Sequence, residues 1–148
     1  MIDLNCKALT HMTKLCIPYM KKGSRIINIA SAAAFCPQPS FGVYAATKGY
    51  VLSFSRSLCA ELEDDEIFVT AVCPGPVATE FFETAGQKKK NTVKNAVMAR
   101  PEAVVKQALL DAKAGKEMSV YGASMKGAEA AAKLLPHRVI LKTMKKFW

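Results

Sequence analysis

The sequence of 148 residues lacks the glycine-rich loops that commonly cradle phosphate groups: neither G-x-G-x-x-G nor G-x-x-x-G-x-G occurs in it. It therefore offers no backbone cradle of the kind that a helix N-terminus and nearby glycines make for a pyrophosphate. It also lacks an apolar run of the ~18 residues that a membrane span requires. We expect no signal peptide, because Asp3 and Asn5 interrupt the first residues and no long apolar stretch follows them.

Acidic residues are few, and the cysteines form no recognisable pattern. Twelve Asp and Glu against 21 Lys and Arg give a formal net charge of +9. Such a charge ordinarily points to nucleic acid or an anionic membrane, but here the basic residues concentrate at 88–100 and 138–146. We therefore expect no nucleic-acid partner. The five cysteines show no C-x-x-C or histidine spacing, which predicts reduced, mostly buried thiols in a cytoplasmic protein and no metal site.

Apolar residues make up 51% of the chain, enough for a core and too many for a disordered protein. The length fits one domain or a large part of one. Periodicity and turn residues predict helices and strands in alternation: a helix over 2–22, a strand over 25–30, a helix over 41–63, a strand over 67–73, a helix over 101–114, a short strand over 118–121 and helix from about 124. The order strand, helix, strand predicts an α/β fold with a right-handed parallel crossover.

Three residues form a candidate proton-transfer site. Tyr44 and Lys48 stand one helical turn apart, and Ser31 follows the predicted strand that precedes their helix. A phenol is a poor acid or base at neutral pH, and an ammonium group one turn away favours its ionised form. A hydroxyl beside them can hold a substrate oxygen. The set suits the addition or removal of a proton on a carbonyl or alcohol oxygen while hydride moves at carbon.

Ser31, Tyr44, Lys48 and Asn5 together resemble the catalytic set of the short-chain dehydrogenases/reductases. The resemblance runs from Met1 to about residue 82. It implies that Tyr44 is the general acid or base, that Ser31 binds the substrate oxygen, and that Lys48 assists Tyr44 and contacts the nicotinamide ribose. Asn5 would hold a water in a proton relay to Lys48.

The segment Val72-Cys73-Pro74-Gly75-Pro76-Val77-Ala78-Thr79 carries the second part of the resemblance. In the family this turn holds the nicotinamide end of NAD or NADP. The implied cofactor-binding residues are Tyr44, Lys48, Pro74, Gly75, Val77 and Thr79. NADP is slightly favoured over NAD. The resemblance thus implies an NAD(P)-dependent oxidoreductase for a ketone or secondary alcohol, with no particular substrate indicated.

The fold implied is the second half of a doubly wound, parallel-sheet Rossmann fold of three α/β/α layers, in one partial domain over 1–148. We divide it into a catalytic core (1–82), a substrate lid (83–100) and a C-terminal helical region (101–148). Since Met1 falls inside a family motif, we expect a preceding cofactor-binding half and an inactive isolated chain. The alternative is a non-catalytic fragment or dimerisation module. Either form is expected to associate as a homo-oligomer through the helices over 2–22 and 41–63.

Two further segments bear on partners. Phe81, Phe82 and Met98 are candidates to line an apolar substrate pocket, with packing of a short helix as the alternative. The C-terminal helical segment is amphipathic and basic, a pattern that suits an anionic membrane or a protein partner. We rank packing on its own domain or on another subunit above membrane association.

Overall fold

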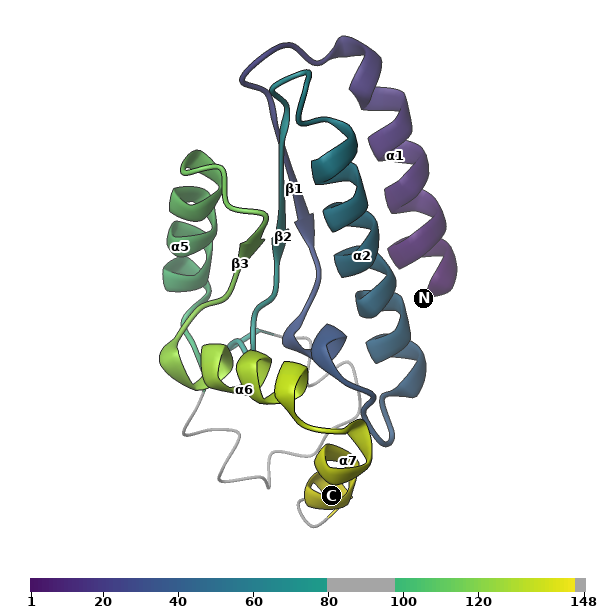
Figure 1. The fold of residues 1–148 in the computed structure, drawn as a ribbon, viewed down its shortest axis with the longest axis vertical. Coiled ribbons are helices and arrows are strands. Elements are labelled where there is room, and N and C mark those ends of the chain that lie inside the picture. Colours follow the sequence, from purple (N-terminus) through teal and green to yellow (C-terminus); the bar gives the residue numbers. More distant parts are fainter. Residues whose placement is uncertain (80–97, 146–148) are drawn as a thin grey trace.

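The computed structural model describes residues 1–79 and 98–145, so most of the predicted lid, including Phe81 and Phe82, lies outside the described residues. The three strands it contains are β1 (Arg25–Ile29), β2 (Phe68–Val72) and β3 (Met118–Ser119). They form one sheet in the order β1-β2-β3, and both pairs are parallel (Figure 1). The α/β class and the parallel strand pairing predicted from the sequence are confirmed.

Helices cover both faces of this sheet. Helix α2 (Gly42–Glu61) connects β1 to β2, and α5 (Pro101–Lys113) precedes β3. Figure 1 shows α1 (Leu9–Cys16) and α2 on one side of the strands and α5 on the other. Helix α6 (Ala123–Leu134) passes the end of the sheet where β1 and β2 stop (Figure 1). The described residues therefore have the three layers that the sequence predicts.

The core between α2 and the sheet depends on one stripe of α2 and its C-cap. Val51, Ser55, Leu58 and Leu62 recur at helical spacing and are all buried. Ser55 is polar, but its hydroxyl accepts a hydrogen bond from the Asn28 amide at 2.9 Å and donates to the Val51 carbonyl at 2.7 Å. The buried Asn28–Ser55 pair therefore has its hydrogen-bond partners within the described structure. The contact fixes the position of α2 relative to β1.

Tyr50 lies at the surface of α2 rather than in the core. Its side chain is 42% exposed and stacks on Phe54. Its hydroxyl lies 2.7 Å from the Thr10 hydroxyl on α1. Tyr50 thus joins α2 to α1 at the surface, because the core stripe of α2 begins one residue later, at Val51.

The first helical segment is less regular than predicted. It begins as a π-helix (Asp3–Ala8), continues as α1 and ends in a 3-10 turn (Ile17–Tyr19) that contains Pro18. Proline lacks the N–H of a regular helical turn, which explains why the last turn departs from a regular α-helix. The segment stops at Tyr19 rather than at 22. Gly23 follows in the turn with a φ of +85°, a conformation that favours glycine.

The chain after β3 differs from the predicted continuous helix. Helix α6 ends at Leu134, and α7 (His137–Lys145) begins after a break. Leu135 is extended, with a ψ of 141°, because it precedes Pro136 and a residue before proline is disfavoured in helical conformation. In the described parts of the chain, no helix combines the length and apolar character needed to cross a bilayer.

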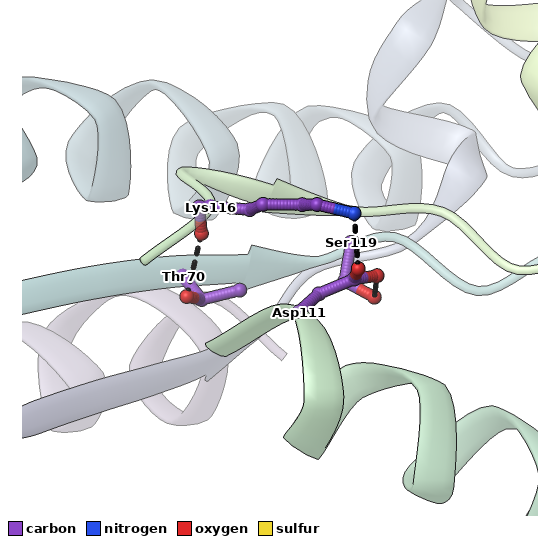
Figure 2. A network of polar contacts seen from close by, with 4 residues as sticks. All are labelled: Thr70, Asp111, Lys116 and Ser119. Atoms are coloured by element: carbon purple, nitrogen blue, oxygen red, sulfur yellow. Dashed lines mark hydrogen bonds and ion pairs between the residues drawn. The ribbon is translucent and has the colours of Figure 1, made fainter. Parts of the chain in front are cut away.

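A polar network locks α5 to β3 (Figure 2). The Asp111 carboxylate accepts a hydrogen bond from the Ser119 hydroxyl at 2.7 Å and pairs with the Lys116 ammonium at 2.6 Å. The Lys116 carbonyl in turn accepts a hydrogen bond from the Thr70 hydroxyl of β2 at 2.7 Å. A strand of only two residues gains its position from these contacts. The end of β3 then leads directly into the turn before α6.

Candidate active site

Ser31 sits two residues after the end of β1, with extended backbone, and is only 9% exposed. Its hydroxyl oxygen accepts a hydrogen bond from the Ala33 N–H at 3.1 Å and so caps the 3-10 turn Ala32–Phe35. The next residue, Ala32, donates its N–H to the Pro74 carbonyl at 2.9 Å. This bond connects the segment that carries Ser31 with the Pro-Gly turn after β2. Two motifs far apart in the sequence are therefore adjacent in the fold.

Tyr44 and Lys48 share one face of the first turns of α2. The Lys48 ammonium nitrogen lies 5.8 Å from the centre of the Tyr44 ring and donates a hydrogen bond to the Ile29 carbonyl at 2.8 Å. Phe41 meets the Tyr44 ring edge to face, with 6.1 Å between ring centres. Burial lowers the pKa of Lys48.

Asn5 contacts the catalytic helix through Thr47 rather than through Lys48. Its amide donates to the Thr47 hydroxyl at 3.0 Å, and that hydroxyl donates to the Tyr44 carbonyl at 2.9 Å. Thr47 is 3% exposed. The predicted water relay from Asn5 to Lys48 stays a prediction. What the structure adds is a direct hydrogen-bonded chain from Asn5 to the backbone of Tyr44.

The predicted cofactor segment follows β2 as an extended turn. Val77 pairs with Ala99 in a short parallel bridge, in which Ala78 donates to the Ala99 carbonyl and Ala99 donates to the Pro76 carbonyl, each at 3.0 Å. The Val77 carbonyl accepts the N–H of Thr79 at 2.8 Å. These bonds hold the turn in one conformation beside the strand ends.

One cavity brings most of the predicted residues together. It has a volume of about 660 Å³, and we call it the catalytic cavity. The predicted site residues that line it are Ser31, Tyr44, Pro74, Gly75, Val77 and Thr79. Lys48 and Asn5 are not among the lining residues. The cavity opens at the carboxyl ends of β1 and β2, where parallel α/β sheets bind their ligands.

Several lining residues were not found from the sequence. Gln38 and Phe41 come from the loop before α2, Leu109 from α5, and Met125 from α6. The prolines of the loop predict only that it passes over the site, not which side chains turn inward. Nothing in the sequence signals that Met125, fifty residues after Gly75, closes the same cavity.

The cysteines supply no reactive group that the structure singles out. All five are free, Cys73 is fully buried and Cys16 is exposed, so the expectation of burial holds for some of them only. Burial raises the pKa of the Cys73 thiol to about 12. Burial also raises the pKa of Cys36, which lines the catalytic cavity. Both thiols therefore stay protonated at neutral pH, and a protonated thiol is a poor nucleophile.

Comparison with known proteins supplies the family. A family model described as short chain dehydrogenase matches residues 1–90. The uncharacterized oxidoreductase YhxC of Bacillus subtilis is 41% identical over 78 residues, which cover 53% of this chain and 27% of that protein. The NADP-dependent 3-hydroxy acid dehydrogenase YdfG of Escherichia coli is 39% identical over 111 residues, covering 70% of this chain and 45% of that protein. The chain thus spans less than half the length of these relatives.

Solved structures agree on the fold. A short-chain dehydrogenase from Sphingobium yanoikuyae in complex with NADPH superposes with a TM-score of 0.71 at 29% identity, over 89% of this chain and 52% of that one. A short chain dehydrogenase from Burkholderia cenocepacia in complex with NADP gives a TM-score of 0.78 at 20% identity, over 97% of this chain and 56% of that one. The second likeness concerns the fold alone. With the family model covering most of the chain and the Rossmann-type fold in place, the chain belongs to the short-chain dehydrogenase family.

Proposed function

We propose that this chain is the catalytic part of an NAD(P)-dependent oxidoreductase that interconverts a ketone and a secondary alcohol. The observation that carries the proposal is the catalytic cavity, which Ser31 and Tyr44 line together with the Pro74–Val77 turn. An apolar pocket with few polar groups is typical of sites for small organic substrates. The family assignment supports redox chemistry with a nicotinamide cofactor.

In the proposed mechanism Tyr44 gives a proton to the carbonyl oxygen during reduction and takes it back during oxidation. Ser31 donates a hydrogen bond to the same oxygen and orients it. The positive charge of Lys48, 5.8 Å from the ring centre, stabilises negative charge that develops on the phenol. Thr47 and Asn5 hold the backbone of Tyr44 in place. A nicotinamide supplies the hydride when it is bound.

The residues present fit the nicotinamide end of such a cofactor. Gly75 keeps the turn narrow, and the Thr79 hydroxyl lines the cavity beside it. Lys48 has three N–H donors and uses one on Ile29, which leaves others for a ribose hydroxyl. We favour NADP slightly over NAD, since the relative YdfG is described as NADP-dependent and the 29% identical structure from Sphingobium yanoikuyae is described with NADPH.

The pyrophosphate and adenosine require residues that this sequence does not contain, so we propose that further polypeptide supplies a nucleotide-binding half. The sheet has room for it. In the described structure β1 is an edge strand, and Ile29 at its end is 55% exposed. An exposed apolar edge of a sheet can pair with a further parallel strand. We therefore expect the chain to be inactive when it is alone.

We propose that the chain forms a homo-oligomer through the helical layer that contains α1. Large apolar side chains on α1 and around it are exposed: Leu4, Met12, Leu15 and Tyr19. An apolar surface of this kind on one helical layer is typical of a protein–protein contact. This observation also supports the second candidate function, a module that dimerises without catalysis. The two candidates differ in whether cofactor binds.

The test is ketone reduction by the protein isolated from its own cells, with NADPH and NADH, after its intact mass has been measured. Tyr44→Phe is expected to lower turnover by orders of magnitude while cofactor still binds. Tyr50→Phe is the matched control, because Tyr50 lies on the same helix and its hydroxyl contacts only the surface threonine Thr10 among described contacts. Near-normal turnover in Tyr44→Phe would contradict the mechanism. Absence of cofactor binding by the isolated protein would favour the dimerisation module.

A further inference from the structure

A second cavity adjoins the catalytic cavity, and Met125 stands between them. The second cavity, which we call the side cavity, has a volume of about 450 Å³. The residues that line both cavities are Gly75, Pro76, Val104 and Met125. Gly75 has no side chain, Pro76 is a rigid ring and Val104 is a short, buried, branched residue. Among the described residues of the shared wall, Met125 is therefore the one with a long, flexible side chain.

The contact between Met125 and Gly75 closes the wall. A Cβ built on Gly75 would lie 2.7 Å from the Met125 Cγ and closer still to its sulfur. The thioether thus occupies the space that any other residue at position 75 would fill. Met125 also packs against the core cluster that includes Val51 and Cys73. Methionine has three rotatable side-chain bonds and adapts readily to a new neighbour. The Met125 side chain can therefore change its conformation while the other residues of the wall keep theirs.

The two cavities differ in chemistry. The catalytic cavity is bounded mainly by apolar residues such as Phe35, Phe41 and Leu109, and Ser31 and Tyr44 also line it. The side cavity is also lined by three residues with polar side chains, Arg100, Tyr121 and Ser124. A molecule that reaches from the hydroxyls past Met125 would have its apolar middle in the first cavity and its far end beside polar groups.

We propose that Met125 is a specificity-determining residue that sets how long an apolar carbonyl substrate the site accepts. In the position seen, its side chain ends the catalytic cavity and favours short substrates. Removal of the side chain joins the two cavities and admits longer alkyl chains. The proposal rests on the proposed function only in placing the carbonyl group at Ser31 and Tyr44.

The experiment measures binding rather than turnover. Dissociation constants of 2-pentanone and 2-decanone are determined by ligand-observed NMR on the 148-residue chain without cofactor, for the wild type and for Met125→Ala. We expect Met125→Ala to bind 2-decanone roughly tenfold more tightly, the gain from burying about two further methylene groups. Binding of 2-pentanone is expected to change less than about twofold, since it ends before Met125.

Met20→Ala is the matched control. Met20 is partly buried and packs against a different cluster, which includes Ile26 and Leu58, and it lines neither cavity. If Met125→Ala fails to fold, Met125→Val shortens the side chain less drastically, and a smaller gain for 2-decanone is expected. Equal gains in Met20→Ala, an unchanged preference in both Met125 variants, or no ketone binding by any of these proteins would overturn the proposal. Loss of turnover in Tyr44→Phe is measured separately, so either proposal can fail while the other stands.

Discussion

The Lys48 ammonium donates a hydrogen bond to the Ile29 carbonyl at 2.8 Å, and this contact connects the catalytic helix with the last residue of β1. Ser31 lies two residues beyond Ile29. The bond therefore fixes the distance between the helix that carries Tyr44 and the segment that carries Ser31. Lys48 would therefore have two roles. Its charge would stabilise the ionised phenol of Tyr44, and one of its three N–H groups holds α2 beside the end of β1.

Replacement of this lysine tests both roles. Lys48→Met is expected to lower the free energy of unfolding by only about 1 kcal/mol, the net value of one hydrogen bond. Turnover in the proposed oxidoreductase is expected to fall far more, because the charge beside Tyr44 is lost as well. Urea unfolding and steady-state kinetics measure the two effects. Lys22→Met is the control, since Lys22 forms a surface ion pair with Glu66. Equal losses of turnover in both variants would contradict a special role for Lys48.

Thr47 offers a second test, of positioning. Its hydroxyl accepts from Asn5 and donates to the Tyr44 carbonyl. Thr47→Val keeps the shape but removes both bonds and leaves the Asn5 amide without this acceptor, so we expect a loss of about 1–3 kcal/mol in the free energy of unfolding. Thr47→Ser keeps the hydroxyl and is expected to lose less. The measurement is chemical denaturation of the chain, and equal stability of the two variants would show that the bonds do not matter.

Structural features that depend only on residues close together in the sequence were predicted from local sequence patterns. The positions of Tyr44 and Lys48 on one face follow from helical periodicity, and the place of Ser31 follows from the end of a β-branched strand. Parallel pairing of β1 with β2 follows from the helix between them. These features need no knowledge of distant contacts, so the sequence alone was sufficient to predict them.

Contacts between distant residues were not predictable in this way. Asn5 and Thr47 are 42 residues apart, and the sequence does not show that the Asn5 amide donates a hydrogen bond to the Thr47 hydroxyl. The buried face of α2 was not predictable either, because α2 also carries apolar residues on its exposed side, such as Val43 and Tyr50. An all-round apolar pattern does not identify the buried face. Met125 belongs to the site only because α6 returns to the end of the sheet.

The break between α6 and α7 was predictable and was missed. Pro136 stands in the sequence, and the residue before a proline is restricted to extended conformations. The basic and apolar residues over 133–146 suggested one amphipathic helix. Helical periodicity continues across Pro136, but the steric restriction that the proline places on Leu135 ends the helix there.

Gly75 and Met125 provide a third test, of packing. Gly75→Ala would place a methyl group within 2.7 Å of the Met125 Cγ, so the side chain must shift. Overpacking of this kind typically costs about 1–3 kcal/mol in the free energy of unfolding. The double variant Gly75→Ala with Met125→Ala is expected to lose less than the sum of the single variants, because the added methyl group then occupies vacated space. Thermal and urea unfolding measure it, and strictly additive losses would show that the two residues do not interact.

Asp111 gives a fourth test, through pH. Burial alone would raise the pKa of its carboxyl, but hydrogen bonds from Lys116, Ser119 and Gln107 and the charge of Lys116 hold that pKa below its ordinary value. A carboxyl that is more acidic in the folded state stabilises the fold fully above its unfolded-state pKa of about 3.9. That stabilisation is lost as the pH falls through the lower folded-state pKa. Asp111 should therefore contribute at neutral pH and contribute less in acid.

Asp111→Asn is accordingly expected to lower the free energy of unfolding by about 2 kcal/mol at pH 7, the value of hydrogen bonds to a charged group. The gap between wild type and variant should narrow toward pH 3, because the carboxyl of the unfolded wild type then binds a proton more readily than that of the folded protein, which favours unfolding. Urea denaturation at a series of pH values measures the gap. Asp64→Asn, at an exposed turn position, is the control and should show no such trend. A gap that stays constant from pH 7 to 3 would mean that Asp111 acts through packing and not through its charge, and that the lock between α5 and β3 in Figure 2 does not depend on ionisation.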